Sequence, residues 1–146
     1  TAAIGFNQFK RLNRMKKIRQ QNRNKIVKTL TSSPLWSEQF TFLEPIKNLK
    51  PSWFGLPILI NKKYLENKNK FLKFLDKNGI ETRPIISGNF LNQTCVKLYN
   101  INQNKKSFKN SQEIEDRGFF IGIHVNKITE RQLKLLENKL LKIDEI

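Results

Sequence analysis

The sequence predicts an α+β domain in which helices cover a small antiparallel sheet, with one long helix ahead of it. Three observations support this fold class. Apolar residues recur at helical spacing over the first 31 residues, short β-rich segments follow, and a capped amphipathic segment closes the chain. The 146 residues fit one domain, since a chain near this size buries about 68–70% of its unfolded surface.

The predicted first helix spans residues 1–31 and is amphipathic. Its apolar residues, mostly three, four or eight positions apart, are Ile4, Phe9, Leu12, Met15, Ile18, Ile26 and Leu30. Pro34 ends the helix, because proline cannot donate a backbone hydrogen bond and disfavours helical geometry in the residue before it. Some 28 residues at 1.5 Å each would extend about 42 Å. We therefore expect this helix to pack on something besides its own domain.

Two strands and a helix are predicted next. The segment Phe40–Leu43 alternates and is β-rich, and Trp53–Ile60 is apolar with β-branched members, so both are typical of strands. Helical spacing then marks Asn67–Asn78, whose apolar residues are Phe71, Leu72, Phe74 and Leu75. Gly79 follows at the position where a helix commonly closes with a left-handed residue.

The remaining segments alternate between extended and irregular. A short strand is predicted over Ile80–Ile86, broken near Pro84. Residues Ser87–Lys109 contain Gly, many Asn and no sustained period, so we expect a long loop, and such loops are commonly functional or disordered. One or two helical turns over residues 111–117 lead into a strand over Phe119–Val125.

The last helix begins after Thr129, which forms a capping box with Gln132. The threonine hydroxyl can accept from the third residue's amide while the glutamine side chain reaches back. One apolar face follows, formed by Leu133, Leu136, Leu140 and Ile143.

A formal net charge of +16 makes the chain strongly basic. Clustered Lys and Arg are the footprint of a nucleic-acid interface, since they attract phosphate and release counterions. Lys, Asn and Ile are all over-represented, however, as codon supply in an A/T-rich genome would produce, and basic residues occur in nearly every segment. We therefore favour a solvated basic surface and regard nucleic acid as an unlikely partner.

The start of the chain, its longest apolar run and its cysteine content indicate where the protein is located. The chain begins at Thr1 with no apolar leader, and we expect it to be cut from a longer polypeptide. The longest apolar run, Leu56–Ile60, is far shorter than the about 20 residues of a membrane span. Cys95 is the only cysteine, so no intramolecular disulfide forms. These features predict a cytoplasmic protein without a membrane partner.

The sequence contains no complete catalytic apparatus. His124 is the only histidine and the carboxylates are scattered, so no metal site is predicted. A nucleophile and base pair is not recognised either, and the phosphate-binding and dinucleotide-binding glycine motifs are absent. A lone histidine on a strand is more often packed or solvated than catalytic. We predict no catalytic and no metal-binding residue in this chain.

A candidate ligand-facing rim follows the predicted strand over residues 80–86. Arg83 presents a planar fork of donors that suits phosphate or carboxylate. The turn Ser87-Gly88-Asn89 can expose backbone amides and one side-chain amide to an oxygen-rich ligand. From these residues alone, a ligand site and a surface arginine followed by a simple turn are equally good interpretations.

Four segments carry a family resemblance in order along the chain: "TAAIGFNQFKRL", "SWFGLPILI", "LDKNGIETRPIISGNFLNQ" and "EDRGFFIGIHVNKITERQL". They resemble the DegT/DnrJ/EryC1/StrS family of pyridoxal-phosphate (PLP) sugar enzymes, beginning with the helix that follows the cofactor-binding domain. The "WFG", "TRP" and "GN" motifs are most similar to the branch that removes the 3-hydroxyl from nucleotide-linked 4-keto-6-deoxyhexoses. The resemblance covers nearly the whole chain.

This resemblance implies the small carboxy-terminal domain of the fold-type I PLP-dependent transferase fold. Residues 1–33 would link residues 34–146 to a larger PLP-binding domain that this chain lacks. The implied cofactor of the full-length enzyme is pyridoxal phosphate or pyridoxamine phosphate, and we expect this chain alone to bind neither. A nucleotide-linked keto-deoxyhexose is the implied substrate, in a homodimeric enzyme of deoxysugar or lipopolysaccharide synthesis.

The resemblance also selects the candidate substrate-binding residues. Arg83 matches the arginine of the family's "TRP" segment, and Asn89 matches the asparagine of its "GN" loop, with Gly88 keeping the backbone close. Ser87 and Phe90 flank this loop and complete the set.

We therefore predict the carboxy-terminal portion of a nucleotide-linked 4-keto-6-deoxyhexose 3-dehydratase, inactive on its own. Three alternatives stay open. The chain could come from a sugar-nucleotide aminotransferase of the same family, it could be a basic nucleic-acid-binding module, or it could serve only association. The base that separates the two enzymes, lysine or histidine, would lie outside this chain.

Overall fold

Four antiparallel strands form one sheet in the part of the chain that the structure describes, residues 2–101, 104 and 107–146 of a computed structural model. The strands are β1 (Phe40–Phe42), β2 (Gly55–Ile60), β3 (Thr82–Arg83) and β4 (Gly118–Gly122), in the order β1-β2-β4-β3. Every neighbouring pair is antiparallel. This confirms the predicted small antiparallel sheet.

The strands are shorter than the sequence pattern predicts. β3 keeps only two residues of the predicted 80–86 strand, because Pro84 cannot donate to the ladder. The same constraint is met differently at Pro57, which lies inside β2. β1 ends where Phe42 pairs with Ile58, so Pro57 lies beyond the β1 pairing and faces only β4 as a neighbouring strand.

The predicted first helix is two helices, α1 (Ala2–Phe9) and α2 (Leu12–Thr31), so a single helix over residues 1–31 is wrong; Thr1 lies outside the described residues. The break falls at Lys10 and Arg11, where the Arg11 amide donates to the Gln8 carbonyl three residues back (3.0 Å). Ile4 and Phe9 are five positions apart, out of step with the helical period. Both stay exposed, at 72% each, because nothing described in this chain covers α1.

The helix α3 (Lys68–Lys77) follows a 3₁₀ helix, η1 (Lys62–Asn67), and covers the sheet. Its Phe71 and Leu75 are fully buried, as their helical spacing predicts. The helix closes as expected, because Gly79 has a positive φ of 77° and the Ile80 amide returns to the Leu75 carbonyl (3.0 Å).

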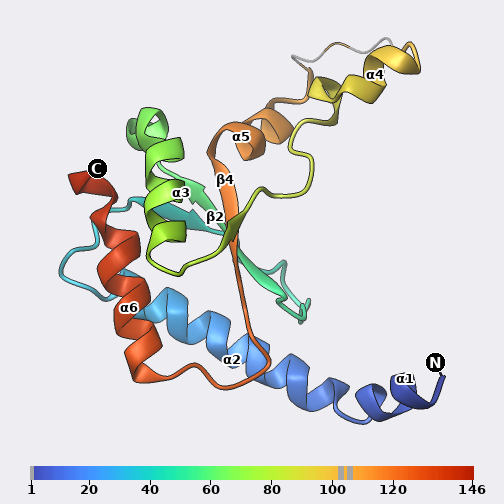
Figure 1. The fold of residues 1–146 in the computed structure, drawn as a ribbon, viewed down its shortest axis with the longest axis vertical. Helices are drawn as coiled ribbons and strands as arrows, with labels where there is room; N and C mark the ends of the chain where they lie inside the picture. The colour runs from blue at the N-terminus through green and yellow to red at the C-terminus, as the bar shows by residue number, and fades with distance from the viewer. Residues whose placement is uncertain (1, 102–103, 105–106) are drawn as a thin grey trace.

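The predicted loop over residues 87–109 is not irregular throughout, which corrects that prediction. It contains a 3₁₀ helix η2 (Phe90–Asn92) and a helix α4 (Thr94–Leu98), while its residues 102–103 and 105–106 lie outside the described residues. The Asn89 side chain accepts from the Leu91 amide and so caps η2. Figure 1 shows α4 projecting away from the sheet, beyond helix α5 (Lys109–Arg117).

The chain ends in α6 (Glu130–Leu140) and a 3₁₀ helix η4 (Leu141–Glu145). The predicted capping box is confirmed, with the Thr129 side chain and Gln132 bonded reciprocally. α6 packs against α2, on the same side of the molecule (Figure 1). Among the described residues, no helix combines the length and the apolar character that crossing a bilayer requires.

The core lies between the sheet and the helices α2, α3 and α6. Its buried members are Ile26, Leu30, Phe40, Leu56, Ile58, Ile60, Tyr64, Phe71, Leu75, Ile80, Phe119, Ile121, Ile123, Leu133, Leu140, Leu141 and Ile143. Leu91 and Val96 are also buried but lie outside this core, in the α4 projection. The domain thus consists of one packed body and a projecting segment with buried residues of its own.

Candidate functional site

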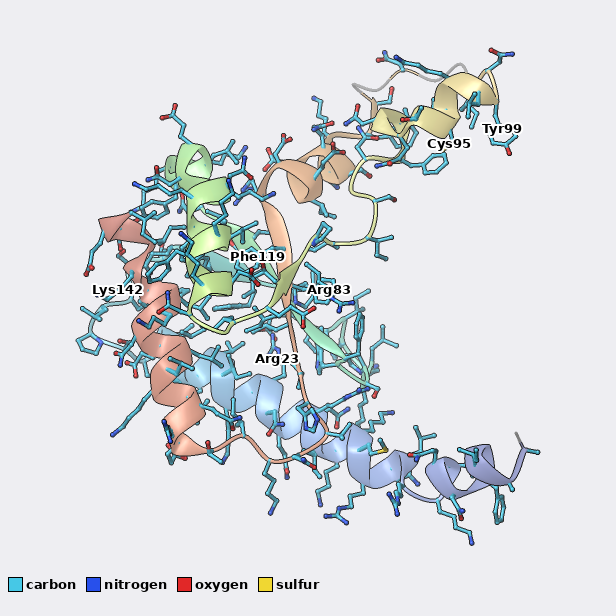
Figure 2. The ribbon with its side chains drawn as sticks, in the orientation of Figure 1. Arg23, Arg83, Cys95, Tyr99, Phe119 and Lys142 are labelled. Carbon is cyan, nitrogen blue, oxygen red and sulfur yellow. The ribbon has the colours of Figure 1, made fainter. Side chains whose placement is uncertain are left out.

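Arg83 lies at the edge of the sheet, where β3 ends (Figure 2). Its Nε and Nη2 donate to one carboxylate oxygen of Glu81, at 2.9 and 2.7 Å. Both side chains are mostly exposed, at 66% and 71%. An exposed ion pair contributes only about 0–1 kcal/mol, so the guanidinium can exchange Glu81 for an incoming anion at little cost.

The turn after β3 has unusual backbone geometry. The Gly88 amide donates to the Ile85 carbonyl (3.1 Å), and Ile86 and Gly88 have positive φ angles of 49° and 59°. A positive φ is uncommon for a β-branched residue. A Cβ on Gly88 would lie 2.6 Å from the Cβ of Glu115, so the glycine is needed both for its φ and for the close approach of α5.

Asn89 is buried, with only 1% of its surface exposed. Its backbone amide donates to Glu115 Oε2 (2.7 Å), its Nδ2 donates to Gln112 Oε1 (3.0 Å), and its Oδ1 accepts from the Leu91 amide (3.2 Å). In this conformation the Asn89 side chain supports the loop from within and is not open to solvent.

The other loop candidates are more accessible. Phe90 is half exposed, at 50%. Ser87 is half-buried, and its carbonyl accepts from Gln93 Nε2 (3.0 Å). The structure therefore brings the five predicted residues into one segment, with Arg83 and Phe90 outward, Ser87 intermediate, and Gly88 and Asn89 inward.

A cavity of about 560 Å³ lies between α2, the end of β4, α6 and residues 79–81, which precede this segment in the chain, and the sequence patterns do not indicate it. Its lining includes Ile26, Glu81, His124, Lys127, Gln132 and Leu136. The five candidate residues do not line it, but Glu81 does, and Glu81 bonds to Arg83. His124 is oriented by its Nδ1, which accepts from the Asn126 amide (3.1 Å).

Asn22 is a buried polar residue that the sequence analysis missed. It is 3% exposed, and its Nδ2 donates to the carbonyls of His124 (3.0 Å) and Asn126 (2.7 Å) while its Oδ1 accepts from the Ile128 amide (3.0 Å). One signal could have found it. Asn22 stands midway in the eight-residue gap between Ile18 and Ile26, where the buried stripe of the helix calls for an apolar residue.

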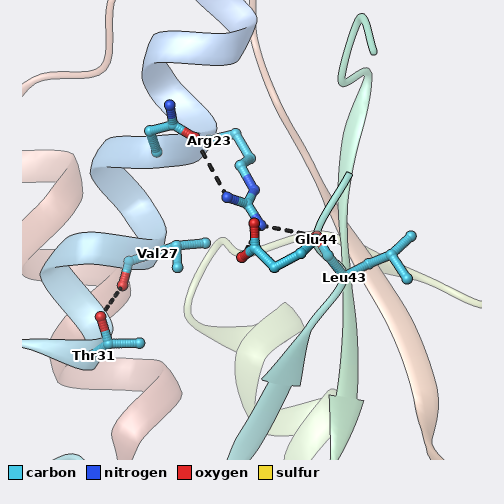
Figure 3. A network of polar contacts seen from close by, with 6 residues as sticks. Arg23, Val27, Thr31, Leu43 and Glu44 are labelled. Carbon is cyan, nitrogen blue, oxygen red and sulfur yellow. Dashed lines mark hydrogen bonds and ion pairs between the residues drawn. The ribbon is translucent and has the colours of Figure 1, made fainter. Parts of the chain in front are cut away.

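Arg23 joins α2 to the β1–β2 hairpin (Figure 3). It is 6% exposed, and its Nη2 donates to the Leu43 carbonyl (2.8 Å) and to Glu44 Oε1 (2.6 Å). Its guanidinium also lies 5.3 Å from the Trp53 ring centroid, a cation–π contact. Arg23 is thus a structural arginine whose charge is already neutralised.

A polar network joins η4, at the end of the chain, to η1 and to the residue before β1. Asp144 accepts hydrogen bonds from the Tyr64 hydroxyl and from Gln39 Nε2 (2.8 Å), and Gln39 is fully buried. Burial alone would raise the pKa of Asp144, but these hydrogen bonds and the charge of Lys63 outweigh it. The pKa of Asp144 therefore lies below its ordinary value of 3.8.

Neither a metal nor PLP fits the residues that the structure describes. No group of three or more His, Cys, Asp or Glu among them could hold a metal ion. PLP in this family needs a base, lysine or histidine, and a partner for its ring nitrogen. Lys127, His124 and Glu81 share the cavity, but all three are exposed. His124 Nδ1 accepts from the Asn126 amide, and Glu81 is bonded to Arg83.

The sequence is similar to one protein family and to curated proteins. The sequence model of the DegT/DnrJ/EryC1/StrS aminotransferase family matches residues 1–138. The GDP-4-keto-6-deoxy-D-mannose 3-dehydratase of Escherichia coli O55:H7 is 30% identical over 124 residues, which cover 85% of this chain and 30% of that protein. This chain therefore spans about a third or less of the length of such relatives.

The fold is similar to that of solved structures. The E. coli GDP-4-keto-6-deoxy-D-mannose-3-dehydratase with bound hydrated PLP matches with a TM-score of 0.78 and 27% identity, covering 94% of this chain and 34% of that one. Helicobacter pylori PseC, an aminotransferase involved in the biosynthesis of pseudoaminic acid, matches with a TM-score of 0.78 and 22% identity over 98% of this chain and 36% of its own. The second likeness concerns the fold alone.

Proposed function

This chain belongs to the DegT/DnrJ/EryC1/StrS aminotransferase family, and from that premise we propose that it is the carboxy-terminal portion of a PLP-dependent sugar-nucleotide 3-dehydratase. The observation that carries the proposal is the 30% identity to a GDP-4-keto-6-deoxy-D-mannose 3-dehydratase over 85% of this chain. The matched part is 30% of that relative.

The substrate in this proposal is a nucleotide-linked 4-keto-6-deoxyhexose, with a GDP-linked sugar as the first choice. Arg83 would meet an anionic group, because its fork of donors matches phosphate oxygens and its present partner is weakly held. Ser87 and Phe90 would contact the sugar nucleotide from the loop. Gly88 and Asn89 would not contact the ligand themselves but would fix the loop backbone that presents Ser87 and Phe90.

The alternative is a sugar-nucleotide aminotransferase of the same family. The likeness to PseC supports it at the level of fold. We prefer the dehydratase because the sequence identity to a 3-dehydratase, 27–30%, is higher than the 22% identity to PseC.

The cofactor, in our proposal, is bound by the rest of the enzyme. It supplies an electron sink for the reaction, while the residues of this chain bind and orient the sugar and exclude water. We propose further that the complete enzyme is a cytoplasmic homodimer of deoxysugar or lipopolysaccharide synthesis. This chain alone would neither bind PLP nor turn over substrate.

Residues 1–33 would form the link to the PLP-binding domain, and residues 34–146 the carboxy-terminal domain. The exposed apolar side chains of α1 support this division. Ile4, Phe6 and Phe9 are 61–72% exposed, although helices of globular proteins usually bury such residues against a neighbour. The missing domain would cover them.

The test is an assay of the complete polypeptide, with the upstream coding sequence restored, on GDP-4-keto-6-deoxymannose. Loss of the C3 hydroxyl, read by mass spectrometry or NMR, is the expected result. Transfer of an amine to the sugar would favour the aminotransferase, and no reaction of either kind would refute the proposal. In parallel, the 146-residue chain should show no visible absorbance of bound PLP.

A titration with duplex and single-stranded nucleic acid at low salt tests the remaining alternative. A nucleic-acid-binding module would bind with an affinity that falls steeply as salt rises. We expect no specific binding, because the basic residues are spread over the whole sequence.

A further inference from the structure

One face of α5 meets the loop that carries the candidate residues, and the proposed function does not use it. Glu115 Oε2 accepts from the Asn89 backbone amide (2.7 Å) and from Asn92 Nδ2 (3.0 Å). Gln112 Oε1 accepts from Asn89 Nδ2 and from Asn92 Nδ2, both at 3.0 Å. Two side-chain oxygens of the helix thus hold both ends of the loop segment 89–92.

The positions of these two residues suit this contact. Gln112 and Glu115 are three apart and therefore lie on the same face of the helix. Gly88 lacks a side chain at the point where Glu115 comes closest, where a Cβ would be only 2.6 Å from the Glu115 Cβ. Any other residue at position 88 would push the loop away from both acceptors.

The helix itself is fixed to the body of the domain. Lys68 of α3 donates to the carbonyls of Glu115 and Asp116, at 2.8 Å each. Arg117 Nε donates to the Ile60 carbonyl of β2 (2.8 Å). The position of the loop is therefore set by α5, and the position of α5 is set by the sheet and α3.

We propose that Glu115 and Gln112 are positioning residues for the sugar-nucleotide loop, an inference that rests on the proposed function. We call the contacts of Glu115 and Gln112 with Asn89 and Asn92 the clamp. Leu91 is buried while its neighbour Phe90 is half exposed. By fixing the backbone on both sides of these two residues, the clamp determines which of the two side chains faces outward. A loop that is ordered before binding loses less conformational entropy when the ligand arrives. The clamp acts on substrate affinity without touching the substrate.

The carboxylate makes a graded test possible. Hydrogen bonds to a charged acceptor are roughly twice as strong as neutral ones. Glu115→Gln keeps one oxygen acceptor but no charge, whereas Glu115→Ala removes the acceptor. The matched control is Glu113→Gln on the same helix, because the ion pairs of Glu113 among the described residues go to Lys62 and Arg117 and not to the loop.

The first measurement is hydrogen exchange of the Asn89 amide, with circular dichroism confirming that each variant folds. Glu115→Ala should speed exchange about tenfold, because a buried donor loses its acceptor. Glu115→Gln should have a smaller effect, and Glu113→Gln none. If the Asn89 amide exchanges at the parent's rate in a folded Glu115→Ala variant, the proposed clamp is refuted, whatever the activity of the enzyme.

The second measurement is steady-state kinetics of the complete enzyme on GDP-4-keto-6-deoxymannose. Glu115→Ala should raise KM about tenfold with kcat and PLP absorbance near those of the parent, and Glu115→Gln should recover most of the loss. A fall in kcat at unchanged KM, or an equal rise in KM for Glu113→Gln, contradicts a positioning role. An inactive parent enzyme counts against the proposed function instead, and the exchange experiment still decides whether the clamp exists.

Discussion

Replacing Asn22 by leucine separates two accounts of α2. By sequence pattern, leucine at position 22 completes the apolar stripe between Ile18 and Ile26 and should stabilise the domain. By structure, it removes three hydrogen bonds to the segment that joins β4 to α6. Their acceptors and donor, all backbone groups 102–106 residues away along the chain, would lose their partner.

The magnitude follows from these three bonds. At a net value of about 1 kcal/mol each, their loss costs about 3 kcal/mol, and more if the freed groups stay out of water. Leucine recovers about 1–2 kcal/mol by burying apolar surface. We expect Asn22→Leu to lower the free energy of unfolding by about 1–2 kcal/mol, and Asn22→Ala by about 3 kcal/mol.

Urea denaturation followed by circular dichroism measures both variants. The control is Asn13→Leu, an exposed asparagine near the start of the same helix, which should change stability by less than about 0.5 kcal/mol. An Asn22→Leu variant as stable as the parent, or more stable, would refute the reasoning, because the apolar stripe would then outweigh the three bonds.

Three further predictions concern the loop, the carboxy-terminal network and the candidate arginine. Gly88→Ala should destabilise the domain by about 1–3 kcal/mol and expose the loop to proteolysis, since the positive φ and the contact with Glu115 both exclude a side chain; digestion at the parent's rate would contradict this. Because the folded pKa of Asp144 is depressed, its contribution to stability is present above the ordinary value of 3.8 and is lost as pH falls below it. Asp144→Asn should therefore flatten the acid limb of the stability profile, and a parent-like limb would count against the network. In the complete enzyme Arg83→Ala should lower kcat/KM for the sugar nucleotide about tenfold or more while PLP absorbance is retained, and unchanged kinetics would remove Arg83 from the site.

Local signals in the sequence predicted much of the fold. The capping box at Thr129 and Gln132 and the close of α3 at Gly79 depend on residues within one helical turn, so their patterns suffice. The antiparallel sheet also follows from short β-rich segments separated by turns. The break at Lys10 and Arg11 was missed because a continuous polar and apolar alternation hides a change of phase between Ile4 and Phe9.

The candidate site was less accessible to sequence reasoning. Arg83 and the 87–90 turn could be selected by chemistry and by resemblance, but burial of Asn89 depends on Glu115 and Gln112, more than twenty residues further on. The cavity has the same character, since α2, the end of β4 and α6 each supply part of its wall. A local sequence pattern does not predict contacts between segments that lie far apart in the chain.

Glu81, which is paired with Arg83 at the edge of the sheet, would compete with any anion for the guanidinium. Any anion that binds Arg83 must first displace a carboxylate that is part of the same chain and cannot diffuse away. Since the exposed pair is worth at most about 1 kcal/mol, the displacement weakens binding by no more than about fivefold. The released carboxylate would stay near the bound anion and repel it, and this repulsion grows with the charge of the anion. In the proposed site Glu81 would therefore lower the affinity of Arg83 for every anion, and most for a doubly charged one.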